Sequence, residues 1–100
     1  MVNFTVAICT YNGAERLPEV LDQLQRQIGI EAITWEILVI DNNSNDNTAN
    51  VVLQYMKNCP NNSQLRYIFE PIQGLGYARI RAMSEAKTQE LVGFLDALPI

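Results

Sequence analysis

Residues 35–48 read WEILVIDNNSNDNT, an apolar run that ends in a polar turn. The run 35–40 predicts a β-strand, and a strand that is apolar on both faces is typical of a buried parallel sheet. The polar segment 41–47 predicts a turn, and Asn45 or Asp46 is placed to cap the helix that follows. This stretch therefore predicts one strand–turn–helix unit, the repeating element of an α/β protein.

The same unit recurs on both sides of this stretch. Residues 4–9, 65–69 and 91–95 predict three further strands. The first strand ends in the polar turn 10–13, and the third is followed by a loop at 71–76. Each of the first three strands is followed by a helical pattern, so the order is βαβαβαβ.

The three predicted helices differ in their apolar faces. In the first, apolar residues recur at helical spacing from Leu17 to Ile28, and Pro18 falls in the first turn, where a missing N–H is tolerated. The second carries Val51, Val52, Tyr55 and Met56, and the third has a small-residue face made of Ala78, Ala82, Met83 and Ala86. Because crossovers between parallel strands are right-handed, we predict an open parallel sheet with helices on both faces.

Composition excludes several classes of function. The 100 residues carry a net charge of −4 without a run of basic residues, so nucleic acid is not an expected partner. The chain has no histidine, which excludes Ser-His and Cys-His catalysis and restricts a metal site to oxygen ligands. Cys9 and Cys59 lack CxxC spacing and are predicted to be reduced thiols. Neither a signal peptide nor a membrane span is recognised, which predicts a cytoplasmic chain; a membrane anchor of a longer, membrane-associated parent protein would lie outside these residues.

In open α/β sheets, ligands bind beyond the carboxyl ends of the strands. The predicted ends carry polar side chains in four places: Thr10, Tyr11 and Asn12; Asp41, Asn42 and Asn43; Glu70; and Asp96.

Two segments at these ends resemble known ligand-binding motifs but lack residues that those motifs require. The segment GLGYAR, residues 74–79, begins like a dinucleotide fingerprint, but Arg79 stands where a third glycine or alanine belongs. The segment from Asp41 begins like a calcium loop, but Asp46 occupies the glycine position and Val52 the bidentate glutamate position.

A third pattern fits nearly the whole chain. It consists of VAICTYNGAERLPEVLDQL (6–24), WEILVIDNNSNDNT (35–48), PIQGLGYARIRAMSEA (71–86) and LVGFLDA (91–97). In this order, these blocks resemble the donor-binding half of family 2 glycosyltransferases with the GT-A fold. The resemblance implies that residues 1–100 form a single, incomplete domain that binds a nucleotide-sugar, with a UDP-sugar favoured.

The resemblance also assigns roles to residues. It implies that Asp41 accepts the N3–H of uracil and that Thr10, Tyr11 and Asn12 surround the base. It places Arg79 near the base and diphosphate, and Gly74 and Gly76 in a loop that approaches the diphosphate. Ile80 and Ala82 depart from the family pattern, which usually has asparagine and often has glycine at these positions.

The family's D-x-D motif implies a divalent metal, Mg²⁺ or Mn²⁺. Asp96 matches its first acid, but Leu98 stands in place of the second. The family's general base and acceptor site follow this strand, so no catalytic residue is assigned here and the 100-residue chain is expected to be inactive alone.

Two other interpretations stay open. The chain could be a truncated or degenerate, non-catalytic α/β domain that binds nucleotide weakly, or that binds a partner chain or itself through an exposed fourth strand. It could also be an unrelated domain that binds a small molecule. Asp41 could serve only an Asx turn; Asp46 and Thr48 are expected to serve the turn and helix, and Glu15 and Glu85 to lie on helix surfaces.

Overall fold

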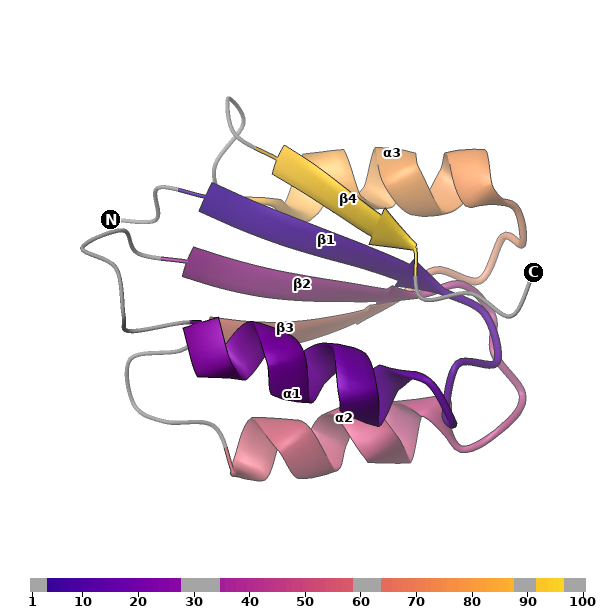
Figure 1. Cartoon of the computed structure of the whole chain (residues 1–100). Coiled ribbons are helices and arrows are strands. Elements are labelled where there is room, and N and C mark those ends of the chain that lie inside the picture. The colour runs from indigo at the N-terminus through magenta and orange to yellow at the C-terminus, as the bar shows by residue number, and fades with distance from the viewer. Residues whose placement is uncertain (1–3, 28–34, 59–63, 88–91, 97–100) are drawn as a thin grey trace.

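The computed structural model describes residues 4–27, 35–58, 64–87 and 92–96. Its elements follow the predicted βαβαβαβ order (Figure 1): β1 (Phe4–Thr10), α1 (Leu17–Gln27), β2 (Trp35–Asp41), α2 (Thr48–Lys57), β3 (Gln64–Phe69), α3 (Leu75–Glu85) and β4 (Val92–Asp96). The strand boundaries lie within one residue of those predicted. The predicted loop 71–76 is too long, because α3 already begins at Leu75.

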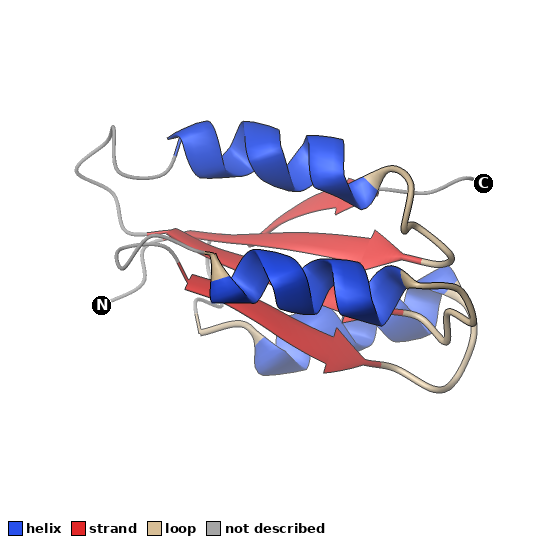
Figure 2. Cartoon of the chain, turned by 90° about the horizontal axis from the view of Figure 1, so that it is seen from below, coloured by secondary structure: helices blue, strands red, loops and turns tan. Residues whose placement is uncertain are grey.

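The four strands form one parallel sheet in the order β3-β2-β1-β4. The register places Thr10 beside Asp41, Asp41 beside Phe69, and Cys9 beside Asp96. All four carboxyl ends therefore meet at one edge of the sheet, which lies at the right of Figure 1. Helices cover both faces of the sheet (Figure 2), as predicted.

Two apolar clusters pack on the two faces of the sheet. Alternation along β1 and β2 sends Ile8 and Val39 to the face covered by α1 and α2, and Ala7 and Leu38 to the face covered by α3. The first cluster contains the large side chains of the core: Val6, Ile8, Leu17, Leu21, Ile37, Val39, Val52 and Leu65. The second is built around alanines and contains Ala7, Cys9, Leu38, Ile40, Ala78, Ala82 and Ala86.

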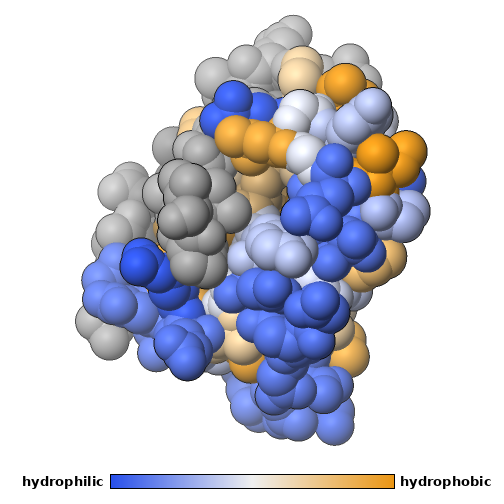
Figure 3. Space-filling model, turned by 90° about the vertical axis from the view of Figure 1, so that its right-hand side faces the viewer, coloured by the Kyte–Doolittle hydropathy of each residue, from blue (hydrophilic) through white to orange (hydrophobic). Residues whose placement is uncertain are grey.

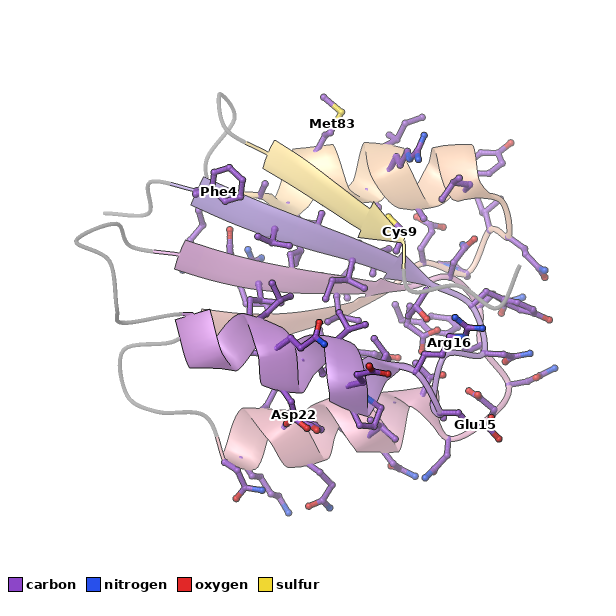
Figure 4. All side chains as sticks on the ribbon, in the orientation of Figure 1. Phe4, Cys9, Glu15, Arg16, Asp22 and Met83 are labelled. Atoms are coloured by element: carbon purple, nitrogen blue, oxygen red, sulfur yellow. The ribbon has the colours of Figure 1, made fainter. Side chains whose placement is uncertain are left out.

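The helix α3 lies on the sheet through small side chains. Ala78 and Ala82 are fully buried against the strands, as predicted. The placement of Met83 on this face was wrong: it is 57% exposed and points away from the sheet (Figure 4). A step of one residue rotates a side chain by about 100° around a helix, which takes Met83 off the face that Ala82 occupies.

A tyrosine hydroxyl joins the two helices on the other face. The Tyr55 hydroxyl of α2 lies 3.0 Å from the carbonyl oxygen of Pro18 and 2.9 Å from Asp22 Oδ1, both on α1, so its single proton is shared between two acceptors. Met56, predicted on the apolar face of α2, is 38% exposed. Within the described part of the chain, no helix has the length and apolarity needed to cross a membrane.

We predict that Ala82→Leu destabilises the fold by about 1–3 kcal/mol, the range for adding methylenes to a packed core. Ala82 is fully buried between α3 and the sheet, so a larger side chain there must displace its neighbours. Urea denaturation followed by circular dichroism measures the change. Met83→Leu, on the exposed face of the same helix, is the matched control and should leave the midpoint unchanged; equal effects of the two variants would contradict this packing.

Candidate functional site

The loops after β1 and β2 are bonded to each other at the carboxyl edge of the sheet. The Asn12 N–H donates to Ser44 Oγ at 2.8 Å, and the Asn45 N–H returns a bond to Asn12 Oδ1 at 2.9 Å. Asn12 adopts a left-handed conformation, with φ of 51°, which asparagine tolerates better than most residues. Asn12 therefore fixes the two loops as one unit.

Asp46 and Thr48 add to this junction. Thr48 Oγ1 accepts the Gly13 N–H at 3.0 Å and donates its own hydroxyl to Asp46 Oδ1. Asp46 Oδ1 also accepts the Thr48 N–H at 2.9 Å, while Oδ2 accepts the Ala14 N–H at 3.3 Å. These contacts confirm that both residues serve the turn and the start of α2. The N-cap position belongs to Asn47, which makes no side-chain cap bond, so the predicted cap position was wrong by one or two residues.

Hydrogen bonding also sets the charge state of Asp46. Partial burial would raise the pKa of this carboxyl, but the bonds from the Thr48 hydroxyl and from the Thr48 and Ala14 N–H groups outweigh it and lower the pKa. Asp46 is therefore a carboxylate whose charge is stabilised by hydrogen bonds from the two loops.

Asp41 is buried and has a protein donor on each carboxylate oxygen. Its side chain sits in an Asx turn, with Oδ1 accepting the Ser44 N–H at 3.0 Å, and the residue is 1% exposed. Oδ2 accepts the Tyr67 hydroxyl at 2.5 Å. Burial and the adjacent Asp41 carboxylate raise the pKa of Tyr67, which keeps this hydroxyl a donor. A ligand N–H at Asp41 must share an oxygen with these donors or displace Tyr67; this tyrosine was missed in the sequence.

Asn42 joins the end of β2 to the loop between β3 and α3. Its Nδ2 donates to the carbonyl of Ile72 at 2.8 Å and to that of Glu70 at 3.3 Å, and its Oδ1 accepts the Gly74 N–H at 2.8 Å. The Asn42 N–H in turn donates to the carbonyl of Thr10 at 2.7 Å. Because Asn42 is only 5% exposed, its amide acts as an internal clamp between three segments of the edge.

The two glycines predicted to lie near the diphosphate, Gly74 and Gly76, differ in whether the backbone requires glycine. Gly74 has φ of 142°, a conformation that L side chains rarely adopt, and a Cβ there would lie 3.1 Å from Tyr77 Cδ2. A Cβ at Gly76 would meet nothing within 4 Å, so the protein itself does not require glycine there. Gly74 is the N-cap of α3, with no side-chain cap bond and no acidic residue in the first turn. Arg79 is exposed one turn further along.

Glu70 links this loop to α3. The residue is 6% exposed, and its Oε2 accepts the Ile72 N–H at 2.8 Å while Oε1 accepts Arg81 Nε at 3.0 Å. The Ile72 N–H and the Arg81 guanidinium together lower the pKa of Glu70. Arg81 was not predicted to have a role.

A third buried carboxylate lies at the opposite end of the sheet from Asp41 and Glu70. Glu36 is fully buried and accepts bonds from Thr5 Oγ1 at 2.9 Å, Arg66 Nη1 at 2.5 Å and the Lys87 N–H at 3.1 Å. Burial opposes the charge of Glu36, but these donors, with Arg66 first among them, outweigh it and lower its pKa. Glu85, predicted on a helix surface, is partly exposed on α3 and also contacts two bases: Arg66 Nη2 lies 3.4 Å from its Oε1 and Arg81 Nη1 3.7 Å from its Oε2.

A sequence signal for this network existed. An acid interrupts the apolar second strand, and a base interrupts the apolar third strand. An acid buried on one strand is stabilised by a base on the neighbouring strand, because an unpaired buried charge is costly.

The predicted metal ligand falls at the end of β4. Asp96 is the last residue of this strand and pairs in register with Cys9 of β1, a buried thiol outside any disulfide. The side chain of Asp96 is not described, and Leu98 and Cys59 lie outside the described residues. Among the residues that are described, no three acidic, cysteine or histidine side chains form a group that fits a metal ion. The metal therefore stays a prediction.

The edge as a whole brings most of the predicted residues together. Thr10, Asp41 and Asp96 close three adjacent strands, Tyr11 and Asn12 lead the first loop, and Gly74 is tied to this edge through Asn42. Figure 3 views this end of the molecule, where hydrophilic side chains cover the lower part and apolar ones gather toward the top.

This architecture has a clear family. The model of the family described as "Glycosyl transferase family 2" matches residues 5–97, and the chain belongs to this family. Its fold is the Rossmann-like N-terminal half of a GT-A glycosyltransferase.

Known proteins support the same assignment. A dolichyl-phosphate beta-glucosyltransferase of Trichomonas vaginalis is 34% identical over 96% of this chain, and an uncharacterized glycosyltransferase of Nostoc sp. is 32% identical over 96%. These matches cover 30% and 28% of the two relatives, so the chain spans less than a third of their length. The solved structure of residues 1–349 of TarS from S. aureus superposes with a TM-score of 0.79, at 29% identity, over 97% of this chain and 27% of that one. TarS has also been solved in complex with UDP-GlcNAc and with UDP.

We predict that stability falls on acidification below about pH 4.5. The pKa values of Glu36 and Glu70 are lower in the folded chain than the ordinary value of 4.5. Their contribution is therefore complete above that value and is lost as the pH falls through the folded-state pKa values. Thermal unfolding between pH 7 and pH 3 measures this profile.

Two variants separate the buried carboxylates from the general charge of the chain. Glu36→Gln leaves Arg66 without its buried partner, and it should lower stability at pH 7 and flatten the acid decline. Glu15→Gln, at an exposed position, should keep the wild-type profile. A wild-type midpoint that rises toward pH 3 would contradict the arrangement.

Proposed function

We propose that this chain is the donor-binding part of an inverting glycosyltransferase that transfers a sugar from a nucleoside diphosphate to an acceptor hydroxyl, in polysaccharide or glycoconjugate synthesis. The observation that carries the proposal is the carboxyl edge of the sheet, where hydrogen bonds join the loops after β1, β2 and β3 into one surface. This surface belongs to a domain of glycosyl transferase family 2. The complexes of TarS with UDP and UDP-GlcNAc favour a uridine nucleotide as the ligand.

The base is proposed to bind at the ends of β1 and β2. Tyr11 is partly exposed beside the left-handed Asn12, so its ring is available to the base. Asp41 is the proposed acceptor for the uracil N3–H. Since Tyr67 already donates to Asp41 Oδ2, we propose that uracil shares this carboxylate, which has about four lone-pair sites for its two protein donors.

The diphosphate is proposed to bind beside the start of α3. The first turn of this helix carries no acidic side chain, and its N-cap makes no side-chain bond. The unsatisfied N–H groups and the dipole of a helix start favour an anion, and the exposed Arg79 adds a positive charge one turn away. Gly74 and Gly76 keep side chains out of the approach.

A divalent cation, Mg²⁺ or Mn²⁺, is proposed to bind the diphosphate with Asp96 as its protein ligand. Such an ion stabilises a departing nucleoside diphosphate as a Lewis acid. With leucine at position 98, the chain supplies one carboxylate where the family pattern supplies two.

We predict that the chain binds UDP and that Asp41→Asn weakens this binding at least about tenfold, the range for a hydrogen bond to a charged group. Titration of ¹⁵N-labelled protein with UDP in Mg²⁺ measures the affinity, and the Asn12, Ser44 and Gly74 amides should shift. Asp96→Asn should remove the gain that Mg²⁺ gives. Asp22→Asn, on the exposed side of α1, is the control.

Two results would contradict the proposal. One is the absence of UDP binding by the wild-type chain, and the other is unchanged affinity in Asp41→Asn. Asn preserves the shape of Asp41 and can still accept the Ser44 N–H, so a properly folded variant separates loss of the acceptor charge from loss of the loop.

A second function is favoured by the position of β4. This strand lies at an edge of the described sheet, and α3 carries the exposed apolar side chains of Leu75, Ile80 and Met83. Unpaired strand edges pair readily with other chains. We propose that two copies associate through β4.

Self-association predicts a dimer whose population rises with concentration. Light scattering coupled to size-exclusion chromatography should show it in the micromolar range, and Ile80→Glu with Met83→Glu should shift it toward monomer. A monomer at all concentrations up to about 1 mM, where weak complexes are populated, would exclude this interface.

A further inference from the structure

We propose that the ion pair between Glu70 and Arg81 is a positioning device that sets the start of α3 for the diphosphate of the ligand. The inference rests on the proposed function, and it adds two residues that act through the helix and the loop without touching the ligand. It starts from a contact between a buried acid and a base in the second turn of α3.

Glu70 joins two structures with one carboxylate. Its Oε2 holds the Ile72 N–H at 2.8 Å, which closes the loop after β3, and its Oε1 holds Arg81 Nε at 3.0 Å. Its own N–H donates to the carbonyl of Asp41 at 2.8 Å, which anchors Glu70 to the end of β2. Glu70 therefore fixes the position of Arg81, and with it α3, relative to β2, the strand that carries Asp41.

The apolar contacts of α3 do little to fix its position along its axis. The helix packs on the sheet through Ala78, Ala82 and Ala86, whose methyl groups project only a short distance from the helix and form a nearly smooth surface. Large side chains that interlock with a neighbouring surface resist sliding, and alanines offer much less of this resistance. Polar contacts along one flank of α3 must supply the axial registration.

A line of charged groups runs along that flank. Arg81 contacts Glu70 at one end and approaches Glu85 Oε2 at 3.7 Å; Arg66 donates to the Glu85 carbonyl at 2.8 Å and to the buried Glu36 at the other end. The line fixes α3 at both ends of the sheet. The Glu70 end is the one that adjoins Gly74 and the exposed N–H groups of the first turn.

The hydrogen bonds of Asn42 link the position of α3 to the proposed diphosphate site. Asn42 Oδ1 holds the Gly74 N–H, so the loop is fixed at Gly74 by β2 while the helix is fixed at Arg81 by Glu70. Loss of the Arg81 contact leaves the start of α3 held only through Gly74, so the first turns of the helix can reorient about this point. The N–H groups that face the diphosphate would then move, whereas the surface for the base, built by the loops after β1 and β2, would stay.

The experiment compares UDP with uridine, which lacks the diphosphate. In the full 100-residue chain, Arg81→Met should weaken UDP about tenfold and leave uridine affinity within about twofold, as measured by ¹⁵N amide titration. Arg81→Lys should recover part of the UDP affinity because a lysine can still pair with Glu70. Lys57→Met, which removes one positive charge at the far end of α2, should change neither affinity.

Glu70→Gln distinguishes positioning from direct contact. If Arg81 acts through Glu70, this variant weakens UDP as Arg81→Met does, and the double variant is no weaker than either alone. UDP affinity that holds or rises in Glu70→Gln would instead mean that the released Arg81 binds phosphate itself, which overturns the inference.

The other outcomes are equally decisive. Equal losses for UDP and uridine in Arg81→Met, with a lower unfolding midpoint, would mean a structural role only and would overturn the inference while leaving the proposed function standing. If the wild-type chain binds no UDP, the proposed function itself fails and the inference falls with it.

Discussion

The in-register parallel pairing of β1 with β2 is the constraint on which the site depends. It places Thr10 beside Asp41 and brings the two following loops within hydrogen-bond distance. A slip of two residues would keep the same faces buried but would separate Asn12 from Ser44 and Gly13 from Thr48. The loop contacts and the apolar strands therefore support a single register, and the edge of the sheet is built as a consequence.

The polar side chains of this edge are largely engaged with the protein. Ser44, Asp46 and Thr48 bind backbone N–H groups of the first loop or of their own turn, and Asn42 clamps the loop before α3. A ligand at this edge would meet the partly exposed Tyr11 and the start of α3, and it would share the carboxylate of Asp41 with the donors already bound there. An edge whose loops are already bonded to one another loses little conformational entropy when a ligand binds, which is the general advantage of a preorganised site.

The two faces of the sheet are stabilised differently. Large apolar side chains lie between the sheet and α1 and α2, whereas α3 combines an alanine face with a flank of ion pairs. A buried ion pair contributes little net stability compared with an apolar pair, but its geometry is specific. The face that carries the proposed diphosphate site is thus the one whose packing is defined by directional contacts.

The sequence alone predicted the order of elements, the parallel sheet and the edge where the polar residues meet, because apolar runs and helical periodicity are local properties. It also predicted the turn role of Asp46 and Thr48 and, through four motifs, the family. The partners of the buried carboxylates depend on how the chain folds: Tyr67 binds Asp41, Arg66 binds Glu36, and Arg81 binds Glu70. These pairs join residues 11 to 30 positions apart, and they form because a carboxylate buried by strand packing must take the nearest donor that the fold brings to it.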